Sequence, residues 1–276
     1  MKRLLLSLTL ATATLTAPQA TTAASAATTI AGCSLAPTGG TVTRSFFPAS
    51  TRSYNLRVPA GLTGNAPLLL SLHGLGSVPF FQEQATGWSQ TADAEKFIVA
   101  YPAGDPNWNL AVGSPDVRFL RDVVARIAAE SCVDRSRVYV EGGSLGSWMS
   151  QRAACDAAGT FAAAAGFMGG SPNTFGGCRP TRPIAVALFH GESDPLIPVA
   201  EGRRTRDEWV ARNKCSPVPV TEPVTDGAAQ TYRGCAAGVT VSWRSYQGLG
   251  HAYPTGTAGA DFRERAWRFL SAHRLP

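Results

Sequence analysis

The sequence predicts an α/β fold with a mostly parallel central sheet and helices on both faces. Two observations predict this class. Continuously apolar runs of strand length recur along the chain, which is typical of strands buried on both faces of a parallel sheet. Segments with apolar residues at helical spacing separate these runs, as the connections between parallel strands require. The length of 276 residues and the hydrophobic content of 44% suffice for one such domain with a sizeable core.

The first half of the chain contains three predicted strands and two predicted helices. Polar and apolar residues alternate over 52–58, and the runs 67–72 and 97–101 are almost entirely apolar, so each predicts a strand. Residues 88–96 can form a helix between the second and third strands. Another helix is expected to begin at Ser114, because a serine followed by a proline supplies both an N-cap and a favourable first position.

The second half repeats the alternation of strand and helix. Strands are predicted over 137–141, 184–189 and 239–246, and helices over 148–158, 200–212 and 261–273. The Pro- and Thr-rich stretch 216–230 is interpreted as a loop or a small insertion. Since no repeat and no linker interrupts this pattern, residues 27–276 are expected to form a single domain.

The first 26 residues are interpreted as a secretory signal peptide. Met1-Lys2-Arg3 is a charged start, an apolar run over 4–10 follows, and Ala24-Ser25-Ala26 offers a cleavage site. The apolar run is too short to be a stable membrane span. We therefore expect a secreted protein. The alternative is a lipid anchor on Cys33, because Ile30-Ala31-Gly32-Cys33 resembles a lipobox.

Six cysteines in an exported chain predict disulfides. The favoured pairs are Cys33–Cys132, Cys155–Cys178 and Cys215–Cys235, although six cysteines allow other pairings and a lipid on Cys33 would leave an odd number. The sequence has no C-x-x-C motif and only four histidines. Neither a metal site nor a cofactor is therefore expected.

The charge distribution argues against a nucleic-acid partner. The net charge of +6 falls to +4 when Lys2 and Arg3 are left out. The remaining basic residues are scattered or share a solvated helix face, as do Arg203, Arg204 and Arg206. We expect a monomer whose partner is a small molecule or a short polymer.

Gly142-Gly143-Ser144-Leu145-Gly146 lies between a predicted strand and a predicted helix. A serine flanked by glycines at such a junction is typical of a nucleophile elbow, a strained turn that exposes the serine hydroxyl above the sheet. The glycines are needed because side chains at those positions would collide. The backbone N–H of Leu145 would then be free to stabilise an oxyanion.

A serine nucleophile needs a histidine as general base and an acid that orients this histidine. His251 is the best candidate for the base, because it lies in a Gly-rich loop after a predicted strand, where functional groups of open α/β sheets gather. His273 lies on the last helix, where a solvated side chain is expected. Asp194 is the favoured acid because a buried strand precedes it, and Glu192 is its rival. Structural roles in loops are the alternatives for both His251 and Asp194.

The pair His73-Gly74 ends an early buried strand. The second oxyanion donor of this architecture belongs after that strand, so the backbone N–H of Leu75 is the candidate. The ring of His73 is expected to hold the loop by hydrogen bonds. Trp108 lies in a later loop on the same side, and two interpretations stay open: an apolar wall for an acyl or aryl group, or ordinary loop packing.

Taken together, these residues resemble the secreted esterases of the poly(3-hydroxybutyrate) depolymerase-like family, which includes feruloyl-esterase-type members. The resemblance runs from about Tyr54 to the C-terminal helix. Besides the elbow it rests on Leu72-His73-Gly74, Trp108-Asn109, Asp116-Val117-Arg118-Phe119-Leu120, Arg137-Val138-Tyr139-Val140, His190-Gly191-Glu192-Ser193-Asp194-Pro195 and Gly250-His251-Ala252-Tyr253-Pro254. It implies an α/β-hydrolase fold with Ser144 as nucleophile, Asp194 as acid and His251 as base.

The resemblance also implies an activity, the hydrolysis of carboxylic esters through an acyl-enzyme. Its implied substrates are hydroxyalkanoate oligomers or hydroxycinnamate (feruloyl-type) esters of the plant wall. An acyltransferase or a serine peptidase would use the same residues, and a non-catalytic surface-binding protein would retain only the fold.

The departures from the family concern the substrate. Leu75 stands where members often carry cysteine, and Leu145 and Ser147 stand where small residues are common. Because the chain ends shortly after the last predicted helix, neither a linker nor a polymer-binding module is expected. Soluble or short-chain esters are therefore expected in preference to crystalline polymer.

Overall fold

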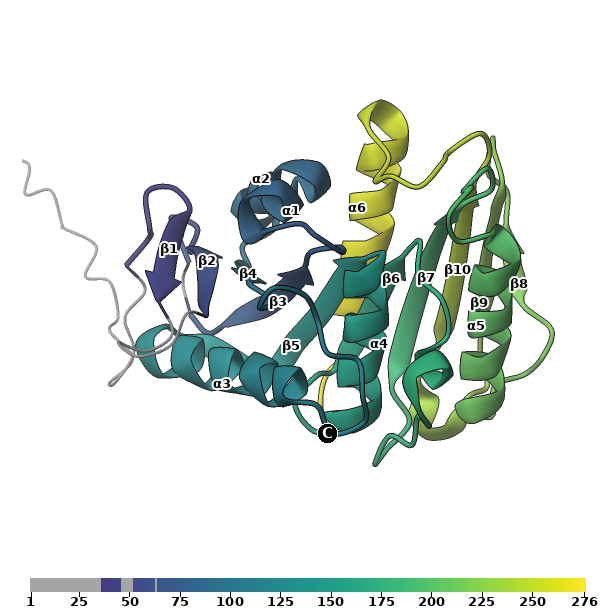
Figure 1. Cartoon of the computed structure of the whole chain (residues 1–276), viewed down its shortest axis with the longest axis horizontal. Helices are drawn as coiled ribbons and strands as arrows, with labels where there is room; N and C mark the ends of the chain where they lie inside the picture. Colours follow the sequence, from purple (N-terminus) through teal and green to yellow (C-terminus); the bar gives the residue numbers. More distant parts are fainter. Residues whose placement is uncertain (1–35, 46–51, 63) are drawn as a thin grey trace, which may run out of the picture.

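The computed structural model describes residues 36–45, 52–62 and 64–276, which form one ten-stranded sheet with helices on both faces (Figure 1). The strands are β1 (Val42–Ser45), β2 (Ser53–Arg57), β3 (Ala66–Leu72), β4 (Ile98–Pro102), β5 (Val133–Gly143), β6 (Ala163–Phe167), β7 (Ala185–Gly191), β8 (Val220–Glu222), β9 (Ala228–Tyr232) and β10 (Val241–Tyr246). The helices are α1 (Pro79–Thr86), α2 (Trp88–Glu95), α3 (Pro115–Glu130), α4 (Leu145–Asp156), α5 (Val199–Arg212) and α6 (Gly256–Ser271), with 3₁₀ turns η1 (Pro172–Phe175) and η2 (Ala236–Gly238).

The strand order is β1-β2-β4-β3-β5-β6-β7-β10-β9-β8. From β4 to β10 all neighbours pair in parallel, and antiparallel strands extend the sheet at both edges. The carboxyl ends of the parallel strands therefore share one edge, where the loops that follow them meet. The predicted α/β class with a mostly parallel sheet is confirmed.

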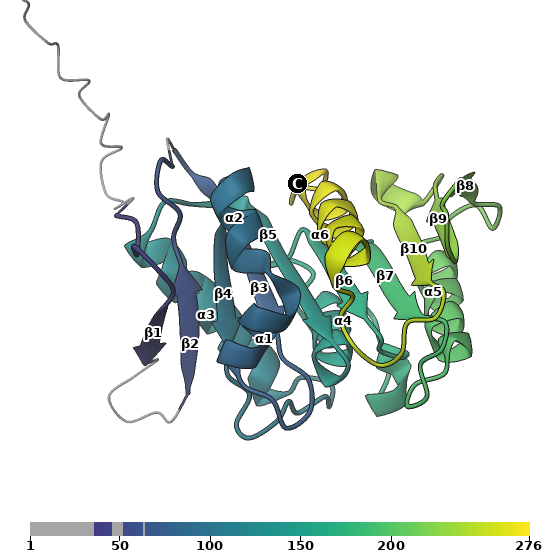
Figure 2. The same ribbon diagram turned by 90° about the horizontal axis from the view of Figure 1, so that it is seen from above.

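Two hydrophobic clusters, one on each face, hold the helices to the sheet. Alternate residues of β3 show how: Leu68, Leu70 and Leu72 join the cluster under α3, α4 and α5, whereas Leu69 joins the cluster under α2 and α6. Figure 2 shows the second group of helices, together with α1, in front of the sheet. Because side chains on a strand alternate between faces, a strand covered on both faces must be apolar throughout.

The structure departs from the predicted elements at several places. Helix α6 begins at Gly256, before the predicted start at position 261, so Asp261 lies within the helix. The stretch 216–230, expected to be a loop or insertion, contributes β8 and part of β9 to the sheet edge. Strand β6 was not predicted, because its sequence AAAGF lacks β-branched residues, and its pairing with β5 and β7 forms it.

The predicted disulfides Cys155–Cys178 and Cys215–Cys235 are both present. The first ties the end of α4 to the loop that follows η1. Cys33 lies outside the described residues, as does the segment 1–26, so the pair Cys33–Cys132, the lipid anchor and the signal peptide stay predictions. None of the helices in the described part of the chain is long and apolar enough to cross a membrane.

Candidate active site

Ser144 occupies a sharp turn between β5 and α4. Its backbone has φ 53° and ψ −120°, a region that residues other than glycine rarely adopt. A Cβ on Gly142 would lie 2.3 Å from Gly146 O, and one on Gly146 would lie 2.1 Å from Leu72 O. The turn thus has the strain, and the need for glycine on either side, that the sequence motif predicts.

The structure brings Ser144, His251 and Asp194 together at the carboxyl edge of the sheet. Ser144 Oγ lies 2.9 Å from His251 Nε2, and His251 Nδ1 lies 2.7 Å from Asp194 Oδ2. The three residues follow β5, β10 and β7, whose carboxyl ends share this edge. A hydroxyl, an imidazole and a carboxylate at these distances form a relay in which the imidazole can remove the hydroxyl proton.

Hydrogen bonds from its own loop fix the carboxylate of Asp194. The backbone N–H groups of Leu196 and Ile197 both donate to Oδ1 at 2.9 Å, which leaves Oδ2 for His251. The buried His190 donates through Nε2 to Ile197 O at 2.8 Å and thus braces the same loop. Burial lowers the pKa of His190, which favours its neutral ring. Its Nε2 lies 3.6 Å from Asp194 Oδ2, farther than the 2.7 Å that separates this oxygen from His251 Nδ1.

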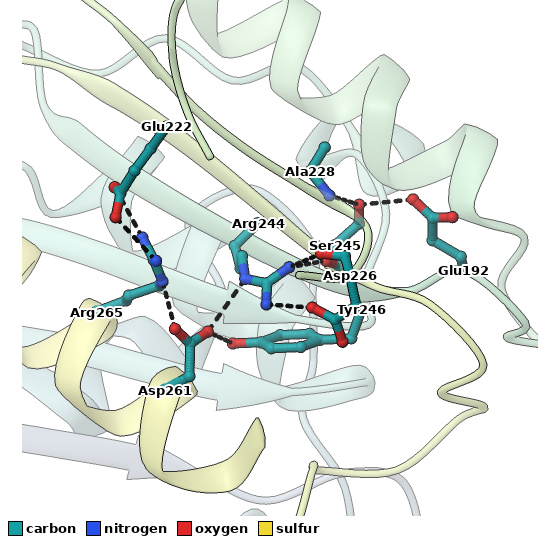
Figure 3. A network of polar contacts seen from close by, with 9 residues as sticks. All are labelled: Glu192, Glu222, Asp226, Ala228, Arg244, Ser245, Tyr246, Asp261 and Arg265. Carbon is teal, nitrogen blue, oxygen red and sulfur yellow. Dashed lines mark hydrogen bonds and ion pairs between the residues drawn. The ribbon is translucent and has the colours of Figure 1, made fainter. Parts of the chain in front are cut away.

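Glu192, the rival acid, points toward Ser245 of β10 (Figure 3). Its Oε1 accepts a hydrogen bond from Ser245 Oγ at 2.7 Å. Ser245 belongs to a network on β10 in which Arg244 pairs with both Asp226 and Asp261. That network joins β10 to α6 and to the loop before β9, so its carboxylates are all engaged away from the relay.

Of the predicted oxyanion donors, Leu145 follows Ser144 directly and Leu75 belongs to a turn next to the elbow. As the first residue of α4, Leu145 has a backbone N–H with no acceptor inside the helix. Leu75 occupies the second position of a β-turn closed by Ser77 N donating to Gly74 O at 3.2 Å, a position whose N–H the turn does not use. A Cβ on Gly74 would lie 3.5 Å from the Ser144 Cβ, so this turn contacts the elbow directly.

His73 holds this turn by hydrogen bonds, as expected. Its Nε2 accepts from Gly104 N at 2.9 Å, so Nδ1 carries the proton and donates to Gly74 O at 2.8 Å. Burial lowers the pKa of His73, which is consistent with this neutral form. Its role in the structure is to support the loop.

Trp108 is 5% exposed and belongs to the core. Its Nε1 donates to His73 O at 2.8 Å, and its ring lies 5.0 Å from the His73 ring. Of the two interpretations that the sequence left open, the structure favours loop packing, because a ring this buried offers almost no face to a substrate. The neighbouring Asn107 accepts a hydrogen bond from Gly76 N at 2.8 Å and braces the same turn.

Sequence reasoning missed two features of the site. One is a set of exposed apolar side chains on the loops around Ser144, among them Leu75 at 70% and Leu196 at 72% exposed. The other is a polar cluster behind the elbow, centred on the fully buried Glu141. A glutamate inside an otherwise apolar strand run was the signal that could have identified the second feature. Among the described residues, no group of His, Cys, Asp or Glu could hold a metal ion.

No family model matches the chain. It is 30% identical to the bifunctional acetylxylan esterase/xylanase of Neocallimastix patriciarum over 80% of this chain and 33% of that protein, and 30% identical to feruloyl esterase B of Piromyces equi over 76% and 44%. The chain thus spans less than half the length of these relatives. It is 28% identical to the probable feruloyl esterase C of Aspergillus oryzae over 87% of this chain and 90% of that protein.

Solved structures share the fold at lower sequence identity. The acetyl xylan esterase from Aspergillus awamori superposes with a TM-score of 0.67 at 17% identity, over 84% of this chain and 99% of that one. An arrangement of sheet and helices shared over nearly the whole of that protein is evidence for a common fold, and the chemistry must be argued from the site.

Proposed function

Since the chain is an α/β-hydrolase of the feruloyl-esterase type, we propose that it is a secreted serine esterase that hydrolyses carboxylic esters through an acyl-enzyme intermediate. The observation that carries the proposal is the continuous relay from Ser144 Oγ through His251 to Asp194. The elbow, the two amides beside it and the braced carboxylate each supply a part that this chemistry needs.

In the first half of the reaction, Ser144 Oγ attacks the carbonyl carbon of the ester while His251 Nε2 takes the hydroxyl proton. Asp194 keeps the His251 Nδ1–H oriented and stabilises the imidazolium that forms. The amides of Leu75 and Leu145 donate to the oxyanion of the tetrahedral intermediate. This intermediate collapses as His251 returns the proton to the leaving alcohol, and the acyl group stays on Ser144.

In the second half, water attacks the acyl-enzyme. His251 takes a proton from the water, and the same two amides hold the second oxyanion. Collapse of this intermediate releases the carboxylic acid and returns the proton to Ser144 Oγ. The cycle consumes one ester and one water, yields one acid and one alcohol, and requires no cofactor.

The exposed apolar side chains favour an ester with an apolar acyl group. Leu75 lies in the proposed oxyanion turn, Leu196 follows the acid by two residues, and Phe80 and Phe81 are exposed at the start of α1. Apolar surface of this kind binds aliphatic or aromatic groups by removing both partners from water. A hydroxycinnamate ester is therefore the leading substrate, and a hydroxyalkanoate oligomer is the second.

Two disulfides support secretion, since such bonds persist in oxidising compartments. They agree with a cleaved leader, although residues 1–26 lie outside the part of the chain that the structure describes.

The experiment compares the purified protein with Ser144→Ala on p-nitrophenyl esters of rising chain length, methyl ferulate and a hydroxybutyrate oligomer. We expect the wild type to hydrolyse at least one of these esters and to react with a fluorophosphonate at Ser144. Equal activity of the two proteins on every ester would refute the proposal. Added alcohol acceptors and a panel of amides identify an acyltransferase or a peptidase, respectively.

A further inference from the structure

Glu141 is a buried carboxyl group three residues before Ser144 on β5. It lies on the sheet face covered by α1, α2 and α6, with no exposed surface. Its carboxylate accepts hydrogen bonds from Ser71 Oγ at 2.9 Å, Trp88 Nε1 at 3.1 Å and Tyr253 OH at 2.6 Å. These donors come from β3, α2 and the loop of His251, so a single carboxylate joins three parts of the molecule.

Tyr253 connects this carboxylate to the general base, because it follows His251 by two residues. Its ring packs against Phe167 and Phe262, with centroids 5.2 and 5.5 Å apart. Gln82 Nε2 donates both to Tyr253 OH and to Ser71 Oγ, at 3.0 Å each. Hydrogen bonds thus fix the phenol on two sides.

The elbow itself is shaped to receive Tyr253. A Cβ on Gly143, the residue before Ser144, would lie 2.6 Å from Tyr253 OH. The phenol therefore lies directly against the backbone from which the nucleophile projects. The same ring that anchors the His251 loop is in contact with the strand end that carries Ser144.

A role in stability alone accounts poorly for this carboxyl group. Burial raises the pKa of Glu141 to about 7, since desolvation outweighs the hydrogen bonds from Tyr253, Ser71 and Trp88. Removing a carboxylate from water is costly, and apolar side chains of similar size usually stabilise such a position better. What the carboxylate provides and an apolar group cannot is a directed link to Tyr253.

We propose that Glu141 and Tyr253 are positioning residues, which hold the His251 loop at the distance from Ser144 that proton transfer requires. The proposal rests on the proposed function, because it takes His251 as the general base. Backbone hydrogen bonds hold the start of this loop, where Ser193 N donates to Leu249 O at 3.0 Å, and Tyr253 anchors it beyond His251. Two glycines, Gly248 and Gly250, precede His251, and no helix or strand begins before Gly256.

The test is Tyr253→Phe, which keeps the ring and removes the hydroxyl. We expect kcat for an ester that the wild type hydrolyses to fall by about 10- to 100-fold with KM within about 3-fold, because misplacement of a catalytic group by about 1 Å has effects of this size. The matched control is Ser71→Ala, which removes another hydrogen bond from the same carboxylate. Because Ser71 lies outside the His251 loop, the control is expected to keep kcat within about 3-fold of the wild type.

A purely structural cluster would give a different result. Tyr253→Phe and Ser71→Ala would then both lower the thermal midpoint, and both would keep the kcat of the wild type. This outcome overturns the proposal. Glu141→Gln is the second variant, for use if Tyr253→Phe does not fold. It keeps the shape of the side chain but replaces one acceptor oxygen by a donor, so we expect the same fall in kcat at constant KM, and an unchanged kcat overturns the proposal.

Labelling by a fluorophosphonate separates this inference from the proposed function. If the wild type is not labelled at Ser144 and the Ser144→Ala variant is as active as the wild type, the proposed function fails. If the wild type is labelled and Tyr253→Phe is labelled at the same rate, the proposed function stands and the positioning role is refuted. We expect the variant to label more slowly by about the same factor as its loss in kcat.

Discussion

His251 Nε2 lies 2.9 Å from Ser144 Oγ, although 107 positions of sequence separate the two residues. Their strands, β5 and β10, are not neighbours in the sheet, because β6 and β7 lie between them. The loops that carry both residues leave the same edge, and the loop of His251 returns across it toward the elbow (Figure 1). The proton path therefore depends on how that loop is held as much as on the two side chains.

Replacing the proposed acid should disable the relay without changing the fold. Asp194→Asn keeps the size of the side chain but cannot stabilise the imidazolium, and it favours the wrong tautomer of His251. We expect kcat to fall by about 10³- to 10⁴-fold. Glu192→Gln is the control, because Glu192 is bonded to Ser245, and its kcat should stay within about 3-fold of the wild type. The reverse order of effects would make Glu192 the acid.

A proline at position 75 should remove one oxyanion donor while preserving the turn. Leu75 is the second residue of a β-turn whose third residue, Gly76, has φ 66°, and proline is common before such a glycine. Leu75→Pro deletes the N–H, and we expect a loss in kcat of about 10²- to 10³-fold. Leu75→Ala retains the N–H and tests the side chain alone. If both variants lose kcat equally, the Leu75 amide is not an oxyanion donor.

An added methyl group inside the elbow should destabilise the fold. In Gly146→Ala the new Cβ would lie 2.1 Å from Leu72 O, a backbone atom that cannot move freely. We expect the free energy of unfolding to fall by about 3 kcal/mol, measured by denaturant titration. Gly159→Ala is the control, because a Cβ there meets nothing within 4 Å. Similar losses in both variants would show that the collision at the elbow is relieved.

Glu141 should make stability depend on pH. Its pKa in the folded protein is about 7, above the ordinary value of 4.5, so the folded state binds the proton more tightly than the unfolded state. The contribution of Glu141 to the free energy of unfolding is fully present below about pH 4.5. It is lost as the pH rises through about 7, by about 3 kcal/mol in total.

Glu141→Gln has no titratable group at this position. Its free energy of unfolding should therefore lack this part of the dependence on pH. Urea titrations of both proteins between pH 4.5 and 8 measure the difference. Parallel pH profiles would contradict the raised pKa.

Much of the site could be predicted from the sequence because its signals are local. The elbow is recognisable because its turn requires glycine on both sides of Ser144, and the buried strands before Leu75 and Asp194 are recognisable from continuous apolar runs. Strand β6 was missed because alanines carry little strand signal, and only pairing between β5 and β7 makes the segment a strand.

What the sequence by itself determined was therefore the fold class and which residues lie at the carboxyl edge of the sheet, because periodicity and turn chemistry act over a few residues. The tertiary structure alone decided which carboxylate reaches His251, that Trp108 is buried, and that Glu141 meets Tyr253 behind the elbow. Each of these depends on the direction of a side chain relative to segments far away in the chain. No local pattern encodes that direction, since it is set by packing between elements.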